Sequence, residues 1–227
     1  MEREKLQQNI KHLSQRIEKA AKKSGRSRED IALIAVSKNI DVQTAAIAAD
    51  LGIKDFGENR VQELKVKADA LPGVRWHMIG RLQTNKVKDV VGRTVLIHSL
   101  DRWRLAEALN KRAAFAGIEV PALLQVNIAG EEQKAGLDPA DVKSFLESVG
   151  QLENLRIYGL MTIAPYTEVP EETRPVFRQL WELRETLRIR DYANVELRYL
   201  SMGMSNDFEI AIEEGANLVR VGTALFK

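Results

Sequence analysis

The stretch Ile31-Ala32-Leu33-Ile34-Ala35-Val36-Ser37-Lys38-Asn39 is the part of the sequence that decides the fold. Residues 31–37 carry no charge, and a lysine follows directly. A continuous apolar run between polar segments is typical of a strand that is buried on both faces, as in a parallel sheet. Lys38 would then stand at the carboxyl end of this strand, which is the end where α/β folds bind ligands.

A lysine at this place has two interpretations. A partly desolvated amine is a candidate for carbonyl chemistry, because desolvation and nearby cations favour the unprotonated, nucleophilic form of an amine. Lysines at strand ends also commonly point into water without a chemical role. The rest of the sequence has to decide between the two for Lys38.

Composition narrows the class of protein. The 227 residues, 44% of them hydrophobic, are enough for one sizeable core in one or two domains. A net charge of +2 provides no basic field for nucleic acid. The absence of cysteine excludes disulfides and thiolate metal sites, and His12, His77 and His98 lack metal-ligand spacing. With no signal peptide at the start and no run long enough to span a membrane, we expect a cytoplasmic protein without membrane or nucleic-acid partners.

Strands and helices alternate along the chain. Apolar residues at steps of three and four predict a first helix over 6–21, which has no strand before it and should pack on the outside or amino end of the fold. The apolar runs predict strands over 31–37, 53–56, 74–79, 94–98, 120–127, 155–161, 197–200 and 218–221. Helices are predicted over 42–51, 60–70, 84–91, 101–116, 138–149, 175–188 and 206–214.

Eight strands in a chain of this length, without a linker, predict a single closed (β/α)₈ TIM barrel over residues 1–227 with an extra N-terminal helix. A doubly wound open sheet is the alternative, and the count of eight favours the barrel. We expect a monomer, because a complete barrel exposes no sheet edge.

In such a barrel the strand-end residues form one ring. They are polar or small, as in the lining of a ligand site. The ring consists of Lys38, Glu58, Asn59, His77, Gly80, Ser99, Asn127, Met161, Ser205, Gly222 and Thr223.

The loops after the seventh and eighth strands have features of a phosphate site. Barrels often bind phosphate there through backbone N–H groups. Gly203 and Gly222 would let the backbone approach an anion, and Ser205 and Thr223 offer hydroxyl groups. Alternatively, Ser205 simply caps the helix that follows it.

Arg220 lies inside the eighth predicted strand, on the face opposite to that of Val219 and Val221. A guanidinium in a central strand is costly unless it is paired or hydrogen-bonded. Its partner could be a structural carboxylate or a ligand. Barrel closure would place Arg220 beside the first strand and therefore close to Lys38.

A lysine for an aldehyde, a phosphate site and a buried arginine are what a barrel needs to hold pyridoxal 5′-phosphate (PLP). Nearly the whole sequence resembles the pyridoxal phosphate homeostasis protein family of the YggS/PROSC type, which is related in fold to the barrel domain of alanine racemase. The matching stretches are Ala35-Val36-Ser37-Lys38, Phe56-Gly57-Glu58-Asn59, Trp76-His77-Met78-Ile79-Gly80, Leu82-Gln83-Thr84-Asn85-Lys86, Gly159-Leu160-Met161, Leu200-Ser201-Met202-Gly203-Met204-Ser205, Asp207-Phe208-Glu209 and Val219-Arg220-Val221-Gly222.

The resemblance implies a cofactor and assigns roles to residues. It implies PLP held as an aldimine on Lys38, with Arg220 facing the pyridine nitrogen. It matches Asn59 and His77 to positions near the cofactor, and Met161 lies in another matching stretch. The phosphate-binding positions that it implies are Ser205, Gly222 and Thr223. The sequence departs from the family at Leu225-Phe226-Lys227, where relatives usually continue into Gly-x-Arg.

These roles favour a binding protein over an enzyme. Arginine keeps its proton, so a pyridine nitrogen facing Arg220 would stay unprotonated and the ring would be a poor electron sink. The barrel leaves no room for the second domain that barrel-type racemases carry. We expect a PLP carrier that supplies apo-enzymes. A PLP-dependent amino-acid racemase is the alternative, and a cofactor-free Schiff-base aldolase is a third reading.

Overall fold

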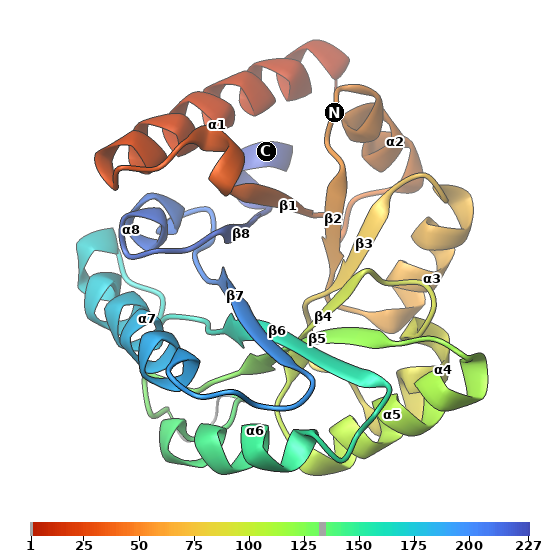
Figure 1. The fold of residues 1–227 in the computed structure, drawn as a ribbon. Helices are drawn as coiled ribbons and strands as arrows, with labels where there is room; N and C mark the ends of the chain where they lie inside the picture. The colour runs from red at the N-terminus through yellow and green to blue at the C-terminus, as the bar shows by residue number, and fades with distance from the viewer. Residues whose placement is uncertain (1, 132–134) are drawn as a thin grey trace.

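The eight strands close into one barrel. A computed structural model describes residues 2–131 and 135–227. Each strand pairs in parallel with its neighbour in the sequence, and β8 pairs with β1 to complete the ring (Figure 1). This confirms the predicted (β/α)₈ barrel and excludes the open sheet.

The observed elements lie within a few residues of the predicted ones. The strands are β1 (Ala32–Val36), β2 (Asp55–Glu58), β3 (Arg75–Met78), β4 (Leu96–Leu100), β5 (Val120–Gln125), β6 (Leu155–Met161), β7 (Val195–Ser201) and β8 (Leu218–Val221). The helices are α1 (Arg3–Lys23), α2 (Val42–Asp50), α3 (Val61–Ala70), α4 (Val87–Val90), α5 (Trp103–Ala116), α6 (Val142–Val149), α7 (Arg174–Arg188), α8 (Phe208–Glu213) and α9 (Thr223–Phe226). Short 3₁₀ turns also occur, and one of them (Thr84–Lys86) forms the start of the helix predicted over 84–91.

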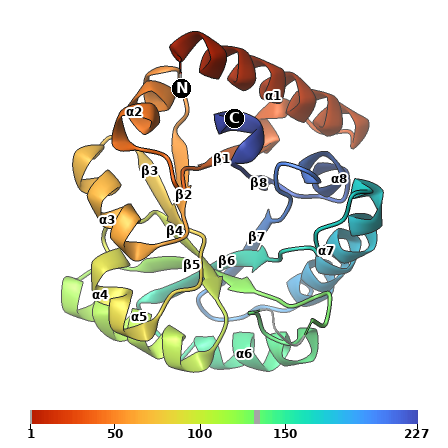
Figure 2. The same cartoon turned by 180° about the vertical axis from the view of Figure 1, so that it is seen from behind.

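The N-terminal helix α1 completes the outer ring of helices. The helix after β8, α9, is only four residues long and cannot cover this part of the barrel. Helix α1 packs against α8, α9 and α2 instead, and both views show it outside the strands (Figures 1 and 2). Its buried stripe contains Leu6, Leu13 and Ile17, as the three-and-four spacing predicts. No described helix is long and apolar enough to cross a membrane.

Strand β1 shows why the opening stretch is apolar throughout. Alternate side chains of a strand point to opposite faces. Ile34 belongs to a small apolar cluster together with residues from four other strands, whereas Ala35 packs in the large cluster that includes the helices. Because both faces of β1 are covered, a run without polar residues is required.

Gly80, just after β3, is held against the backbone of Asn59. A Cβ at Gly80 would lie 2.2 Å from the Asn59 carbonyl oxygen, far inside van der Waals contact. We expect Gly80→Ala to lower the free energy of unfolding by about 1–3 kcal/mol through overpacking. Urea unfolding measures this, with Gly73→Ala as the control, because no heavy atom lies within 4 Å of a Cβ there. Equal losses in the two variants would contradict the prediction.

Candidate functional site

A cavity of about 420 Å³ opens at the carboxyl ends of the strands. Its lining comes from residues at or just after the ends of β1, β2, β3, β5, β6 and β7, together with Arg220 of β8. The lining residues are Val36, Lys38, Asn59, Ile79, Gly80, Arg81, Gln125, Val126, Asn127, Ala135, Ile163, Met204 and Arg220. Lys38, Asn59 and Arg220, to which the family resemblance gives places at the cofactor, therefore share one cavity, together with Gly80 and Asn127 of the predicted ring.

Lys38 lies in the turn after β1, with an exposed side chain that lines the cavity. A second lysine, Lys67, holds the backbone of this turn in place. The Lys67 ammonium donates to the Ser37 carbonyl oxygen at 2.7 Å and to Glu58 Oε1 at 2.5 Å. The Ser37 hydroxyl also donates to Glu58 Oε1, at 2.7 Å. This buried group of polar atoms fixes the backbone immediately before Lys38.

The sequence contains a weak signal for this role of Lys67. It shares a buried face of α3 with Val61 and Leu64, at spacings of three residues. A lysine in an otherwise apolar stripe must find a buried partner. Glu58, at the end of β2, is that partner and is fully buried.

Arg220 is buried, with 4% of its surface exposed. Its Nη1 donates to Ser201 Oγ at 2.6 Å, and its Nη2 donates to the Thr162 carbonyl oxygen at 2.9 Å. Burial lowers the pKa of Arg220 to about 10, an effect opposed by the charge of Asp207, so the group remains a cation at neutral pH. Among the described residues, no carboxylate lies within ion-pair distance of Arg220. A structural carboxylate partner is therefore not observed, and the guanidinium lines the cavity.

The loops after β7 and β8 come together beside Met204, which lines the cavity. Ser205 Oγ accepts hydrogen bonds from the backbone N–H groups of Gly222, at 3.3 Å, and Ala224, at 3.2 Å. Ser205 does not cap α8, whose N-cap residue is Asp207. The result is a hydroxyl next to two backbone donors at the start of α9, which begins with Thr223. This arrangement suits the oxygens of an anion.

The structure does not bring His77 and Met161 to this cavity, so their expected places in the ring are wrong. Met161 is fully buried in the apolar cluster inside the barrel. His77 lines a second cavity, of about 460 Å³, at the amino ends of the strands. The Asp55 carboxylate holds it there, with Oδ1 3.0 Å from His77 Nε2. His77 is not the last residue of β3, which ends at Met78. Because successive side chains of a strand point to opposite faces, the His77 imidazole points into the barrel and does not reach the rim at the carboxyl end.

The fold and the site define a class of protein: a (β/α)₈ barrel of the alanine racemase N-terminal type, whose family model matches residues 2–227. A pyridoxal phosphate homeostasis protein of Aquifex aeolicus is 48% identical over 221 residues, 96% of each chain. The chain belongs to the pyridoxal phosphate homeostasis protein family.

Two solved structures of similar proteins extend the comparison. A protein from Bifidobacterium adolescentis has a TM-score of 0.94 at 34% identity, over 99% of this chain and 95% of that one. PipY of Synechococcus elongatus, solved with PLP bound, has a TM-score of 0.77 at 40% identity, over 87% of this chain and 93% of that one. At these identities the likeness extends beyond the fold to the sequence.

Proposed function

We propose that this chain binds PLP in the carboxyl-end cavity, covalently through Lys38, and serves as a carrier that supplies the cofactor to apo-enzymes. The observation that carries the proposal is that Lys38 shares a cavity with Arg220, a buried cation without a carboxylate partner among the described residues. The name of the Aquifex aeolicus relative and the PLP in PipY support the same cofactor.

The residues fit the three polar parts of PLP. The Lys38 amine can bond to the aldehyde carbon, and the Arg220 guanidinium can donate to the pyridine nitrogen. Ser205 Oγ and the N–H groups of Gly222 and Ala224 can bind phosphate oxygens. A volume of about 420 Å³ lies within the usual range of small-molecule sites. When bound, PLP supplies a carbonyl that exchanges between amines, and a ring that can accept electrons.

The cavity favours holding the cofactor over catalysis with it. Arg220 donates hydrogen bonds and cannot give its proton to the pyridine nitrogen, so the ring stays a weak electron sink. Among the described residues that line the cavity, no tyrosine, histidine or carboxylate offers a second acid/base group beside Lys38. A racemase needs such a group to return a proton to the opposite face of the substrate carbon. We expect the carrier to act as a monomer in the cytoplasm.

Borohydride reduction followed by intact mass spectrometry and peptide mapping tests the proposal. The PLP-loaded protein should be yellow, should lose its visible band on reduction, and should carry one PLP adduct on Lys38. A protein that takes up no PLP would overturn the proposal, and an adduct on another lysine would overturn the role of Lys38. Rapid exchange of α-deuterium into a panel of amino acids would favour the racemase instead.

Ser205→Ala removes the hydroxyl from the proposed phosphate site. We expect about tenfold weaker PLP binding, because a hydrogen bond to an ionised group contributes roughly 1.5 kcal/mol. Titration of the visible band measures the affinity, and Ser144→Ala, at an exposed position on α6, is the control. Inorganic phosphate should compete with PLP in the parent protein and less in Ser205→Ala. Unchanged affinity and competition would place the phosphate elsewhere.

A further inference from the structure

A continuous chain of hydrogen bonds crosses the interior of the barrel and joins the two cavities. It starts at Arg220 Nη1, which donates to Ser201 Oγ at 2.6 Å. Ser201 Oγ lies 2.8 Å from His98 Nδ1, and His98 Nε2 lies 3.0 Å from His77 Nδ1. His77 Nε2 lies 3.0 Å from Asp55 Oδ1, where the chain ends. Arg220 lines the carboxyl-end cavity, whereas His77 and Asp55 line the cavity at the amino end.

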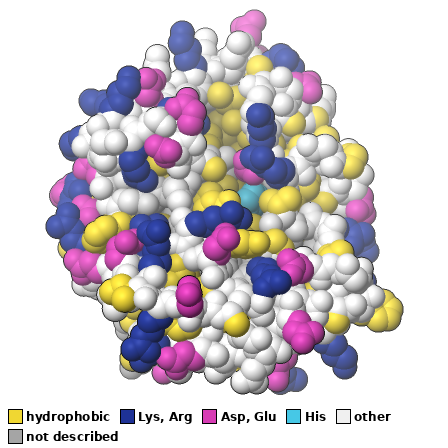
Figure 3. All heavy atoms as spheres, in the orientation of Figure 1, with side chains coloured by type: hydrophobic (Ala, Val, Ile, Leu, Met, Phe, Trp, Pro, Cys, Tyr) yellow, Lys and Arg dark blue, Asp and Glu magenta, His cyan; other side chains and the backbone are white. Residues whose placement is uncertain are grey.

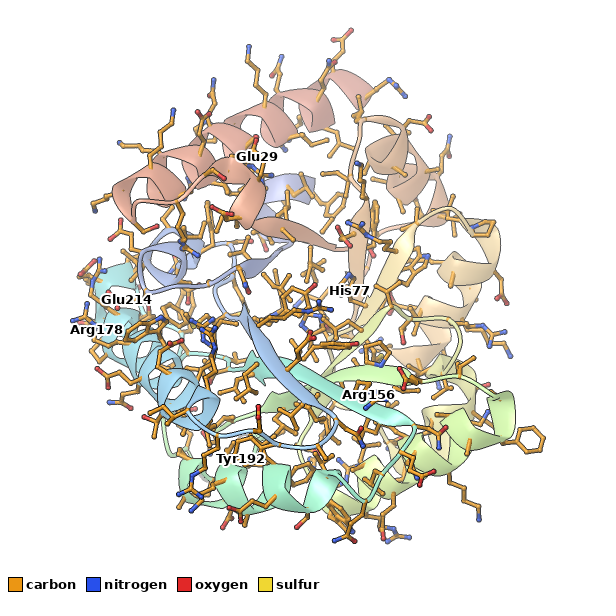
Figure 4. The ribbon with its side chains drawn as sticks, viewed as in Figure 1. Glu29, His77, Arg156, Arg178, Tyr192 and Glu214 are labelled. Carbon is orange, nitrogen blue, oxygen red and sulfur yellow. The ribbon has the colours of Figure 1, made fainter. Side chains whose placement is uncertain are left out.

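The amino-end cavity is visible from outside. Figure 3 shows a hollow on this face with a histidine side chain at its floor, and Figure 4 labels His77 at the corresponding place in the same view. Asp55 also accepts two hydrogen bonds from the Arg75 guanidinium, at 2.7 and 2.5 Å. The chain therefore has an arginine at one end and a carboxylate paired with an arginine at the other.

The charges of Arg220 and Asp55, at the two ends of this chain of hydrogen bonds, determine in which direction each hydrogen bond is donated. A guanidinium only donates, so the Ser201 hydroxyl accepts from Arg220 and can donate its own proton to His98 Nδ1. His98 is then protonated on Nε2 and donates to His77 Nδ1. His77 is likewise protonated on Nε2 and donates to the Asp55 carboxylate, which only accepts. In this arrangement every nitrogen and oxygen along the chain has a partner, with both imidazoles neutral.

The surroundings keep His98 neutral and the two end groups charged. Burial holds the pKa of His98 well below its usual range, and the positive charge of Arg220 acts in the same direction. Burial tends to raise the pKa of Asp55, but its hydrogen bonds to His77 and Arg75 outweigh this and bring the pKa to about 2. The end groups therefore keep their charges at neutral pH. The opposite direction would leave the Ser201 hydroxyl accepting from both His98 and Arg220, with no hydrogen-bond acceptor in the chain for its own proton.

We infer that Asp55, His77, His98 and Ser201 are positioning residues, which orient the Arg220 guanidinium toward the carboxyl-end cavity through this relay. The inference rests on the proposed function in one respect, namely that the group Arg220 meets is the ring nitrogen of PLP. The sequence separates these residues widely, but β2, β3, β4, β7 and β8 bring them into contact inside the barrel. The affinity for PLP then depends on a carboxylate at the opposite end of the barrel from the cofactor.

The direction of the relay is measured on the parent protein by ¹⁵N NMR of the histidine ring nitrogens at pH 8, with and without PLP. We expect His77 and His98 to be neutral and protonated on Nε2 in both samples. His12, which is exposed on α1, serves as the internal reference. His98 protonated on Nδ1 would overturn the inference, and this result does not depend on whether PLP binds.

Two variants at the amino end of the relay distinguish the effect of the hydrogen-bond direction from a general loss of stability. In Asp55→Ala, water replaces the carboxylate, and because water both donates and accepts, the direction is fixed only from the Arg220 end and less strongly than in the parent protein. We expect mixed tautomers at His98 and about threefold to tenfold weaker PLP binding, with the adduct still on Lys38. Arg75→Ala removes the same ion pair but leaves the carboxylate, so its tautomers should match those of the parent and its affinity should lie within twofold.

The outcomes distinguish the relay from its alternatives. Parent-like tautomers and affinity in Asp55→Ala would overturn the inference, as would equal losses in Asp55→Ala and Arg75→Ala. If Asp55→Ala does not fold, Ser201→Ala interrupts the relay beside Arg220 and should weaken PLP binding, while the Asp55 carboxylate still keeps His98 protonated on Nε2; unchanged PLP affinity would overturn the inference. If the parent protein takes up no PLP, the proposed function fails, while the tautomers still test the relay.

Discussion

Lys38→Ala is expected to abolish the covalent PLP adduct completely while leaving the fold intact. The Lys38 amine is the proposed bonding group in the cavity, and no other amine lines the cavity among the described residues. Its side chain is exposed, so its removal should change the free energy of unfolding by no more than about 0.5 kcal/mol. The readouts are the visible band, the mass after borohydride reduction, and urea unfolding.

Lys54→Ala is the matched control for this experiment. Lys54 is also exposed, but it precedes β2 and therefore lies at the amino end of the barrel. We expect its variant to bind PLP like the parent protein. If Lys38→Ala kept the parent's visible band and borohydride adduct, the assignment of the carbonyl-binding lysine would be wrong. If both variants lost the adduct, the effect would not be specific to the cavity.

Lys67→Met should lower the free energy of unfolding by about 3–5 kcal/mol, the largest loss expected among the variants proposed for this protein. The Lys67 side chain is 5% exposed and that of Glu58 is fully buried, with 2.5 Å between Nζ and Oε1. Removing the ammonium leaves a buried carboxylate without a counter-charge, and its other oxygen, Oε2, already lacks a hydrogen-bond partner among the residues that the structure describes. For a chain of this length the melting temperature should fall by roughly 6–20 °C.

A double variant identifies the source of this loss. In Lys67→Met with Glu58→Gln the buried charge is absent, so most of the lost stability should return. Lys65→Met is the matched control on the same helix, because Lys65 is half exposed and lies 3.9 Å from Asp89; its variant should be nearly neutral. If the double variant were as unstable as the single one, an uncompensated Glu58 would not be the cause.

Lys67→Met should also slow the reaction of Lys38 with PLP. Lys67 donates to the Ser37 carbonyl, the last carbonyl before Lys38, at 2.7 Å. Without this hydrogen bond the turn that presents Lys38 is less constrained. PLP adduct formation in Lys67→Met should therefore be slower than in Lys65→Met at a temperature where both variants are folded.

The elements and their order could be predicted because they depend on local patterns. Both faces of β1 are covered, which requires the apolar run from Ile31, and α1 follows from its apolar stripe. Counting the strands then predicted closure, and closure placed Lys38 and Arg220 in one cavity. The contacts of the proposed phosphate site followed less directly, since Ser205 could equally have capped α8.

The residues inside the barrel could not be placed in this way. His77 and Met161 belong to strands whose ends were predicted within a residue or two, but one residue decides whether a side chain meets the rim or the interior. His77 points inward and bonds to Asp55, and Met161 joins the inner apolar cluster. The pairing of Lys67 with Glu58 likewise needed the three-dimensional positions of α3 and β2.

The sequence by itself determined the class of fold, the family, and the lysine and arginine that line one cavity at the carboxyl ends of the strands. The tertiary structure alone decided that Lys67 fixes the turn before Lys38, that His77 belongs to the opposite end, and that Asp55 is joined to Arg220 through two imidazoles and a hydroxyl. The physical reason is that a local sequence pattern reports only which face of one helix or strand is buried. Hydrogen bonds of about 3 Å between residues far apart in the sequence depend on how distant strands are aligned, and only the closed barrel defines that alignment.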